Sequence, residues 1–149
     1  MTAPSLRPAR STDAGKVGAI LSGFVDATPW MPRLHSRAED VSFAGQMIDR
    51  GWVTVALQGA EVAGFLAQNG DDIHALYIKP SAQRQGCGRA LLHHAQGLRD
   101  RLTLWTFQAN TGAQAFYAAH GFHEVARTDG AENDEGLPDI QMQWQKEPA

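Results

Sequence analysis

The first part of the chain places apolar side chains at intervals that match an α-helix. A short opening strand is expected over 5–9, and apolar positions three or four residues apart then predict a helix over 13–26. Thr12 and Asp13 precede this helix, and both are residue types that cap helix N-termini. The chain therefore begins with a strand followed by a helix.

A second helix is predicted over 37–49, where Ser36 and Glu39 have the spacing of a capping box. The pattern then changes to short β-rich runs that are separated by turns, which predicts an antiparallel meander. The strands expected in this meander cover 52–57, 62–68 and 73–78.

The second half of the chain alternates strands with helices. One helix is expected over 86–99 and another over 110–120, where Asn110 can cap the start and Gly121 can end the helix in the left-handed conformation. Apolar runs around these helices predict strands at 102–107, 122–127 and 140–144. The first of these runs suits a buried parallel position. The order of elements predicts an α/β (α+β) fold with a mixed sheet covered by helices.

The composition is that of an ordinary globular protein and mainly adds exclusions. The chain has 149 residues, which predicts one domain over 1–149. Its formal net charge of −3 argues against general nucleic-acid binding. The single cysteine excludes an internal disulfide framework and a four-cysteine zinc site. There is no apolar run of about 18 residues and no signal-peptide pattern, so we expect no membrane partner and a cytoplasmic location.

The segment over 73–92 carries the strongest chemical signal. A strand enters a turn with Gly86 and Gly88, and a helix starts on that turn. N–H groups at a helix start lack intrahelical partners, so such a turn can hold an anion, typically a phosphate. Arg84 and Arg89 could neutralise further phosphate charge. The turn is neither a P-loop nor a dinucleotide fingerprint, because the lysine of the first and the third glycine of the second are missing. An ordinary surface turn is the alternative on this pattern alone.

Two motifs, in this order, resemble those of a known family. Gln83-Arg84-Gln85-Gly86-Cys87-Gly88 resembles the Gln/Arg-x-x-Gly-x-Gly/Ala signature of the GNAT superfamily, the general-control-type N-acetyltransferases, and the lead-in Leu76-Tyr77-Ile78-Lys79-Pro80 is similar as well. Downstream, the family's Asn…(A)xxFYxxxGF stretch is similar to Asn110, Ala115-Phe116-Tyr117 and His120-Gly121-Phe122. The resemblance implies a GNAT-like, mostly antiparallel sheet of about six to seven strands, flanked by about four helices.

The resemblance also implies how acetyl-CoA binds, as a cosubstrate with no permanently bound cofactor. In that family the signature turn holds the pyrophosphate through main-chain N–H groups, and the strand before it pairs with the pantetheine arm. That strand splays from the next strand, here expected at 102–107, and this opens a slot for the thioester. The implied acetyl-CoA-binding residues are Leu76, Ile78, Gln83, Arg84, Gln85, Gly86, Cys87, Gly88, Arg89, Asn110 and Tyr117.

Catalysis in this family joins an amine to the thioester carbonyl without an enzyme nucleophile. The amine must lose a proton, and the thiolate leaves more easily when it is protonated. The resemblance implies that Tyr117 is the general acid. The family's base position corresponds to Asp72, and His74 lies two residues further along the same strand face, so both are candidate bases. We expect Cys87 to be a small buried residue and not a nucleophile.

The acceptor site is expected between two connections that line the acceptor groove in this family. Trp30 and His35 lie between the first two predicted helices, and Glu135 and Asp139 lie in a late acidic loop over 128–139. An acidic rim would attract a cationic amine. The histidines lack the spacing of metal ligands, so no metal is expected.

The sequence thus predicts an N-acetyltransferase that transfers an acetyl group from acetyl-CoA to a primary amine, of a small molecule or a peptide, by direct attack in a ternary complex. A non-catalytic acyl-CoA-binding regulatory domain is the alternative, and a protein-interaction module with an exposed edge strand is a third hypothesis. The late strands often pair between subunits in relatives, so a homodimer is a further expectation. The sequence leaves the acceptor amine and the length of the acyl chain open.

Overall fold

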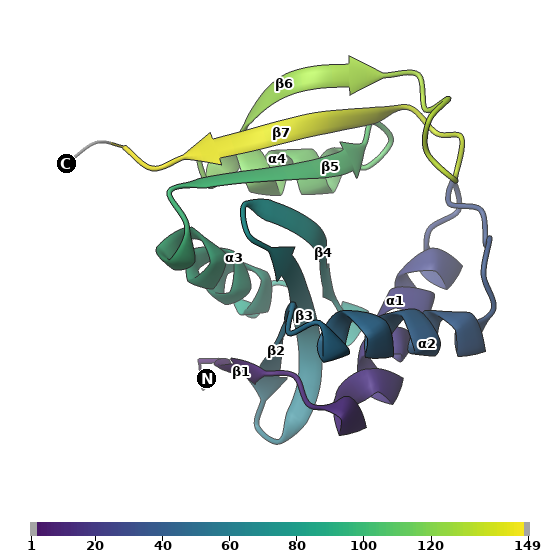
Figure 1. Ribbon diagram of the computed structural model, residues 1–149, viewed down its shortest axis with the longest axis vertical. Helices are drawn as coiled ribbons and strands as arrows, with labels where there is room; N and C mark the ends of the chain where they lie inside the picture. The colour runs from purple at the N-terminus through teal and green to yellow at the C-terminus, as the bar shows by residue number, and fades with distance from the viewer. Residues whose placement is uncertain (1–2, 148–149) are drawn as a thin grey trace.

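One seven-stranded sheet organises the protein, and its strand order shows where the chain crosses over. The computed structural model describes residues 3–147, in which the sheet order is β1-β2-β3-β4-β5-β7-β6 (Figure 1). The strands are β1 (Ser5–Pro8), β2 (Val53–Gln58), β3 (Glu61–Asn69), β4 (Asp72–Ile78), β5 (Arg101–Phe107), β6 (His123–Thr128) and β7 (Asp139–Gln145). The helices are α1 (Ala14–Ala27), α2 (Arg37–Asp49), α3 (Cys87–Leu98) and α4 (Thr111–Ala119). None of these helices is long and apolar enough to span a bilayer.

The apolar pattern predicted every one of these elements to within one residue at each end. The predicted capping box at the start of α2 is present: Ser36 Oγ accepts the Glu39 N–H at 3.1 Å, and Glu39 Oε1 accepts the Ser36 N–H at 2.9 Å. The predicted fold class, a mixed and mostly antiparallel sheet flanked by helices, is confirmed.

Asp13 precedes α1 as predicted, but its side chain does not cap that helix. The carboxylate accepts two hydrogen bonds from the Arg7 guanidinium, at 2.7 and 3.1 Å, and one from the Arg10 N–H at 2.7 Å. Asp13 is only 6% exposed, and the hydrogen bond from Arg7 lowers its pKa to about 2. The carboxylate therefore fastens β1 to the start of α1, a role that the local capping pattern does not predict.

The helices cover the two faces of the sheet and create two apolar cores. Helices α1 and α2 pack on one face around Val17, Met47 and Phe65, whereas α3 and α4 pack on the other around Leu91 and Leu102. Strand β3 runs between the two cores, and its residues from 62 to 67 are all buried. A strand covered on both faces is expected to be continuously apolar, as this one is.

β4 and β5 separate soon after they meet. Their parallel pairing is limited to Asp72 with Thr103 and Ile73 with Leu104. Beyond these pairs β4 continues along β3, whereas β5 pairs with β7 in antiparallel register over its whole length. The sheet consequently opens between β4 and β5 (Figure 1), which matches the splay that the resemblance implied. The parallel position predicted for the 102–107 strand is thus confined to its first residues.

A bulge in β4 sets the direction of His74. The pairing of β3 with β4 shifts register between Ala67 and Gln68, which leaves His74 as the extra residue on β4. The imidazole stacks on the indole of Trp52, with ring centroids 4.8 Å apart and 10° between the planes. Strand alternation is interrupted after His74, since His74 and the next residue, Ala75, both line a cleft on the α1–α2 face, whereas Ile73 packs in the α3–α4 core.

Replacing Asp13 with asparagine should lower the free energy of unfolding by about 1–2 kcal/mol at pH 7, because Arg7 loses a charged partner. The pKa of Asp13 is lower in the folded protein than in the unfolded chain. Its stabilising effect is therefore complete above about pH 4 and is lost as the pH falls through about 2. Urea denaturation of both proteins at pH 7 and pH 3 measures the difference, which should be smaller at pH 3.

The matched control for this comparison is Asp49→Asn, which alters an exposed carboxylate that forms no ion pair within residues 3–147. It should change the free energy of unfolding by less than about 0.5 kcal/mol. A penalty for Asp13→Asn that is equal at both pH values would show that the pairing with Arg7 is not its origin.

Candidate active site

The turn between β4 and α3 presents backbone N–H groups that lack partners. Gly86 is the N-cap of α3 and has a φ of +91°. Arg84 has a φ of +65°, a backbone conformation that residues other than glycine rarely adopt. The first hydrogen bond of the helix runs from the Ala90 N–H to the Gly86 carbonyl at 2.9 Å. The N–H groups over 84–89 donate to no other described residue. They are therefore free to bind an anion.

The side chains of this turn fall into two groups. Those that are exposed are Gln83, Arg84, Gln85 and Arg89. The two arginines among them form no ion pair with any residue from 3 to 147. Cys87, by contrast, is 1% exposed, and its Sγ accepts a hydrogen bond from Gln58 Nε2 at 3.4 Å. The prediction that Cys87 is a small buried residue is confirmed.

The main chain of β4 is unpaired along the gap. The Lys79 N–H donates to the Ala63 carbonyl on β3 at 2.9 Å. Because backbone groups alternate sides along a strand, those of Leu76 and Ile78 point away from β3 and into the gap. The Ile78 carbonyl accepts one long hydrogen bond, from Gln83 Nε2 at 3.4 Å. β4 therefore offers a strand edge with which another extended chain can pair.

α4 brings Tyr117 to the α3 side of this gap. Asn110 caps the helix as predicted, accepting the Ala113 N–H at 3.1 Å. Tyr117 is 8% exposed, and burial, followed by interaction with Tyr77, raises the pKa of its hydroxyl. That hydroxyl forms no hydrogen bond within residues 3–147. Every fully buried side-chain oxygen in this range does have a hydrogen-bond partner, so the Tyr117 hydroxyl is not fully buried. The small exposed part of Tyr117 therefore includes its hydroxyl.

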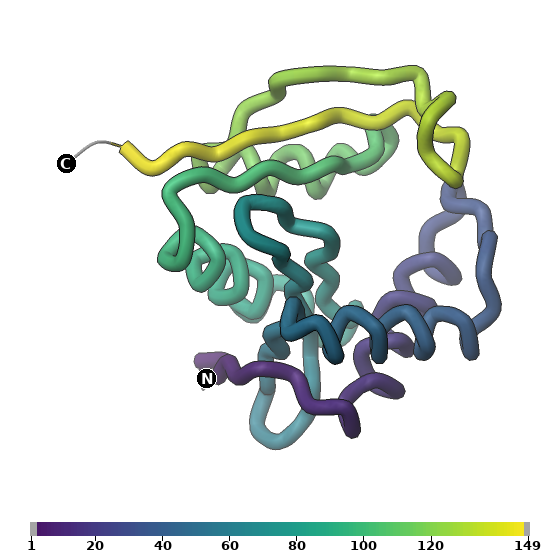
Figure 2. Tube along the Cα trace, viewed as in Figure 1, coloured from purple at the N-terminus to yellow at the C-terminus, as the bar shows by residue number. Residues whose placement is uncertain are grey.

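A cleft of about 490 Å³ lies on the α1–α2 face of the sheet. Its walls are the two helices, the connection between them, β4, and the loop before β7. The connection over 28–36 and the loop over 129–138 lie side by side (Figure 2). Of the residues predicted to bind the acceptor, His35 and Glu135 line the cleft, whereas Trp30 and Asp139 do not.

Trp30 instead contacts a residue of the cleft wall, because its ring packs edge-on against Phe107 with 5.7 Å between the centroids.

The fold also places the two candidate bases differently. His74 lines the cleft, whereas Asp72 lies at the start of β4, where that strand is still paired with β5. Within the described residues, no three His, Cys, Asp or Glu side chains are grouped to hold a metal ion.

Tyr77 is a cleft residue to which the sequence analysis assigned no role. Its ring packs between Phe24 and Phe65, with centroid distances of 4.8 and 5.9 Å. Burial, followed by the charge of Glu135, raises the pKa of Tyr77 to about 12. The hydroxyl is therefore protonated at neutral pH.

Strand alternation was the signal that could have found Tyr77. Leu76 and Ile78 pack with the α3–α4 core, so Tyr77 between them must point to the opposite face. Tyr77 and Tyr117 thus lie on opposite faces of the sheet, and Tyr77 is close enough to contribute to the raised pKa of the Tyr117 hydroxyl.

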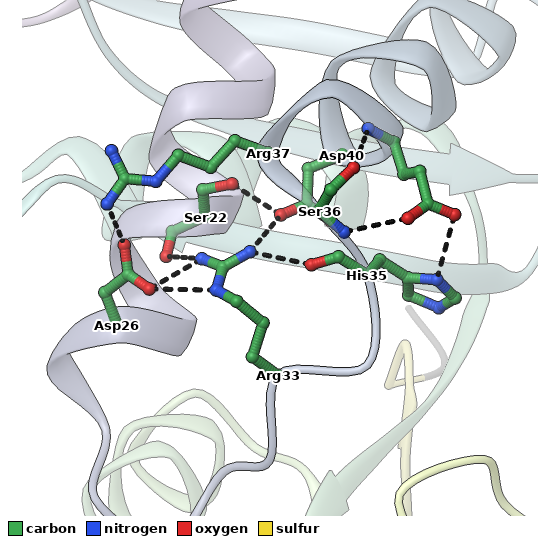
Figure 3. A network of polar contacts seen from close by, with 8 residues as sticks. Ser22, Asp26, Arg33, His35, Ser36, Arg37 and Asp40 are labelled. Carbon is green, nitrogen blue, oxygen red and sulfur yellow. Dashed lines mark hydrogen bonds and ion pairs between the residues drawn. The ribbon is translucent and has the colours of Figure 1, made fainter.

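Arg33 holds the connection between α1 and α2 in place (Figure 3). The guanidinium donates to Asp26 at 2.7 and 3.0 Å and to Asp40 at 3.3 Å. It also donates to the Ser22 carbonyl at 3.1 Å and to the His35 carbonyl at 2.8 Å. These bonds use all five N–H donors of an arginine side chain. One wall of the cleft is therefore fixed by a single residue of the connection itself.

An open strand edge followed by a turn of free N–H groups defines a site for a long, phosphate-bearing cosubstrate. In agreement with this, residues 49–124 match the family model of the acetyltransferase (GNAT) domain. The chain belongs to the GNAT family. It is an acyl-CoA-dependent N-acetyltransferase with acetyl-CoA as its cosubstrate.

Individual relatives extend this similarity over almost the whole chain. Peptidyl-lysine N-acetyltransferase YjaB of Salmonella typhimurium is 32% identical over 127 residues, which are 84% of this chain and 87% of that protein. The solution structure of apo YjaB from Escherichia coli has a TM-score of 0.80 at 24% identity, covering 98% of this chain and 100% of that one. The Salmonella typhimurium yncA structure with acetyl-CoA has a TM-score of 0.75 at 18% identity, covering 99% and 96%.

Replacing Arg33 with alanine should loosen the connection over 28–36. The carboxylates and carbonyl groups that accept hydrogen bonds from the Arg33 guanidinium would lose this common donor. Hydrogen exchange followed by mass spectrometry should show faster exchange over 28–36 and unchanged exchange in β3. Arg33→Lys should have an intermediate effect, since an ammonium group lacks the planar fork of donors.

Arg37→Ala is the matched control, because Arg37 is more exposed and pairs with Asp26 alone. It should increase exchange less than Arg33→Ala does. Equal exchange over 28–36 in the two alanine variants would show that Arg33 does not hold the connection.

Proposed function

We propose that this protein, as one acetyltransferase domain, transfers the acetyl group of acetyl-CoA to the ε-amine of a lysine in a peptide or protein. The observation that carries the proposal is the gap between β4 and β5, which runs from the turn over 83–89 towards a cleft with carboxylates on its rim. Glu39, Asp134 and Glu135 are among the residues that line this cleft. They suit a long cationic side chain. A homodimer through the late strands stays a prediction.

The names of the relatives support the same class of acceptor. The similar proteins YjaB of Salmonella typhimurium and of Escherichia coli are both peptidyl-lysine N-acetyltransferases by name. The cleft opens on the surface between two loops, so a lysine that projects from a peptide chain could enter it while the peptide stays outside. A peptide acceptor accordingly has more support than a small free amine.

In the proposed complex, acetyl-CoA occupies the gap in an extended form. The diphosphate lies on the N–H groups over 84–89, and Arg84 and Arg89 neutralise its charge. The pantetheine arm pairs with the main chain of Leu76 and Ile78 in the manner of an added strand. Asn110, at the start of α4, contacts the arm near the thioester. The other turn residues contribute through their backbone.

The amine nitrogen then attacks the thioester carbonyl carbon, and the carbon–sulfur bond breaks as the amide forms. A lysine amine has an ordinary pKa near 10.4, so it must lose a proton before it attacks. His74 accepts this proton through a water molecule, since His74 lines the cleft and Asp72 does not. The released thiolate takes a proton to leave as free coenzyme A.

Tyr117 donates a hydrogen bond to the sulfur as negative charge develops there. The raised pKa of Tyr117 keeps its hydroxyl protonated at neutral pH, so it is a donor whenever the thiolate forms. A thiol with a pKa near 8.5 is the stronger acid, so complete transfer from Tyr117 is uphill. The hydroxyl therefore stabilises the departing sulfur mainly by hydrogen bonding, and solvent completes the protonation.

Gly86→Ala should weaken coenzyme A binding by about tenfold, because a Cβ at a φ of +91° strains the turn and redirects the N–H groups. Isothermal titration calorimetry with coenzyme A measures this loss. Gly97→Ala, later in α3, has open space around the added Cβ and should leave the dissociation constant unchanged. Equal affinities for the two folded variants would rule out the turn as the diphosphate site.

The decisive test uses a peptide with one lysine and blocked ends, together with the same peptide carrying norleucine instead. Mass spectrometry should locate an acetyl group on the lysine and none on the norleucine peptide. Tyr117→Phe should lower kcat by about 10²-fold and leave the affinity for acetyl-CoA unchanged.

Three results would contradict this assignment. Transfer to small amines but not to peptides would overturn the lysine acceptor. Tight coenzyme binding with no transfer to any amine would favour a regulatory acyl-CoA-binding domain. An unchanged kcat for Tyr117→Phe would remove Tyr117 from the chemistry.

A further inference from the structure

A second cavity, of about 400 Å³, adjoins the proposed acceptor cleft. It lies between β5 and the loop that connects β6 to β7, and Phe107 and Glu135 line both cavities. A chain that placed one side chain in the cleft could therefore place a neighbouring side chain in this cavity. An extended peptide advances about 3.3 Å per residue, so the neighbour would be only a few residues away.

The floor of this second cavity is aromatic. Leu102 and Leu104 point into the α3–α4 core, so the alternation along β5 directs Trp105 to the opposite face. Its side chain is 51% exposed, and it stacks on no other aromatic ring or cation among residues 3–147. A large indole face that is open to a cavity is available to a ligand.

The loop over the cavity is held in shape by its own hydrogen bonds. Asn133 Nδ2 donates to the Leu137 carbonyl at 2.7 Å, and Asn133 Oδ1 accepts the Leu137 N–H at 3.2 Å. The Asp139 carboxylate accepts hydrogen bonds from Asn133 Nδ2 and from the Thr128 hydroxyl. Asp139 is therefore committed to the loop, which accounts for its absence from the acceptor cleft.

Glu132 and Glu135 are the carboxylates of this cavity that the loop does not use. Neither forms an ion pair or a side-chain hydrogen bond within residues 3–147. With the indole of Trp105 they surround a space that would hold a cation between a π-face and negative charge. An acidic side chain would be repelled there, and an apolar one would leave the carboxylates without a partner.

We propose that this cavity binds the arginine or lysine side chain of a residue close in sequence to the acceptor lysine. Trp105 and Glu132 would then select peptides in which the modified lysine has a basic neighbour. This inference rests on the proposed function, because it assumes a peptide acceptor, and it adds the sequence context that the enzyme prefers.

The test uses peptides that are identical except at one position near the acceptor lysine, which is arginine, its neutral isostere citrulline, or glutamate. Each position within three residues of the lysine is examined in turn. For at least one position, kcat/KM should be about tenfold higher with arginine than with citrulline, and lowest with glutamate. The double variant Trp105→Ala/Glu132→Gln should bring the arginine-to-citrulline ratio close to one.

Two further variants separate this effect from a loss of structure. Trp105→Phe keeps an aromatic ring and should give an intermediate ratio. Asp129→Asn removes a carboxylate of the same loop that does not line the cavity and should keep the wild-type ratio. Equal kcat/KM values for arginine and citrulline peptides at every position, or a wild-type ratio in the folded double variant, would overturn the proposal.

A binding measurement distinguishes failure of this inference from failure of the proposed function. Calorimetry with peptides that carry acetyl-lysine at the acceptor position needs no turnover. Tighter binding of the arginine peptide, with the difference lost in the double variant, would support the cavity assignment even if no peptide were acetylated. The absence of acetylation would then contradict only the proposed function. Equal binding of the arginine and citrulline peptides would contradict the cavity assignment.

Discussion

The early separation of β4 from β5 is the constraint on which the rest of the site depends. After the pairs at Asp72 and Ile73, β4 has a partner on one side only, because β5 turns to pair with β7 along its whole length. An unpaired strand edge inside a sheet leaves backbone donors and acceptors unsatisfied, which is unfavourable unless a ligand or water binds them. A fold that keeps such an edge open is prepared for an extended cosubstrate.

The same gap lies between the two apolar cores, so residues from both faces of the sheet can contact the substrates. Tyr117 reaches the gap from the α3–α4 core, and Tyr77 lies among residues of the α1–α2 core. Burial raises the pKa of both hydroxyls, so both carry a proton at neutral pH. Neutral hydrogen-bond donors suit a centre at which negative charge develops on oxygen and then on sulfur.

The distribution of charge along the gap matters more than the small net charge of the chain. Arg84 and Arg89 stand beside the free N–H groups of the turn, and neither has an acidic partner in the described chain. Glu132 and Glu135 stand near the other end, also without a cationic partner. This polarity fits an anionic cosubstrate at one end and a cationic acceptor at the other. Arg33, whose donors are all occupied within the protein, serves the structure of the cleft wall.

The sequence by itself determined the elements and the chemistry that depends on neighbours in the chain. The helix over 37–49, the cap at Asn110 and the left-handed glycine after α4 follow from contacts between residues a few positions apart, which a local pattern records. The turn of Gly86 could be found for the same reason. Its motif also resembled a family's signature, and that resemblance led to the cosubstrate.

Tertiary structure decided what depends on distant segments. The bulge that directs His74 comes from the pairing of β3 with β4, and the pairing of Asp13 with Arg7 replaced the expected helix cap. The acceptor cleft and the second cavity, which have Phe107 and Glu135 in common, adjoin because a loop near the C-terminus folds beside the connection between α1 and α2. Register and loop packing are set by contacts between segments far apart in the chain, and a single sequence does not reveal which distant residues will meet.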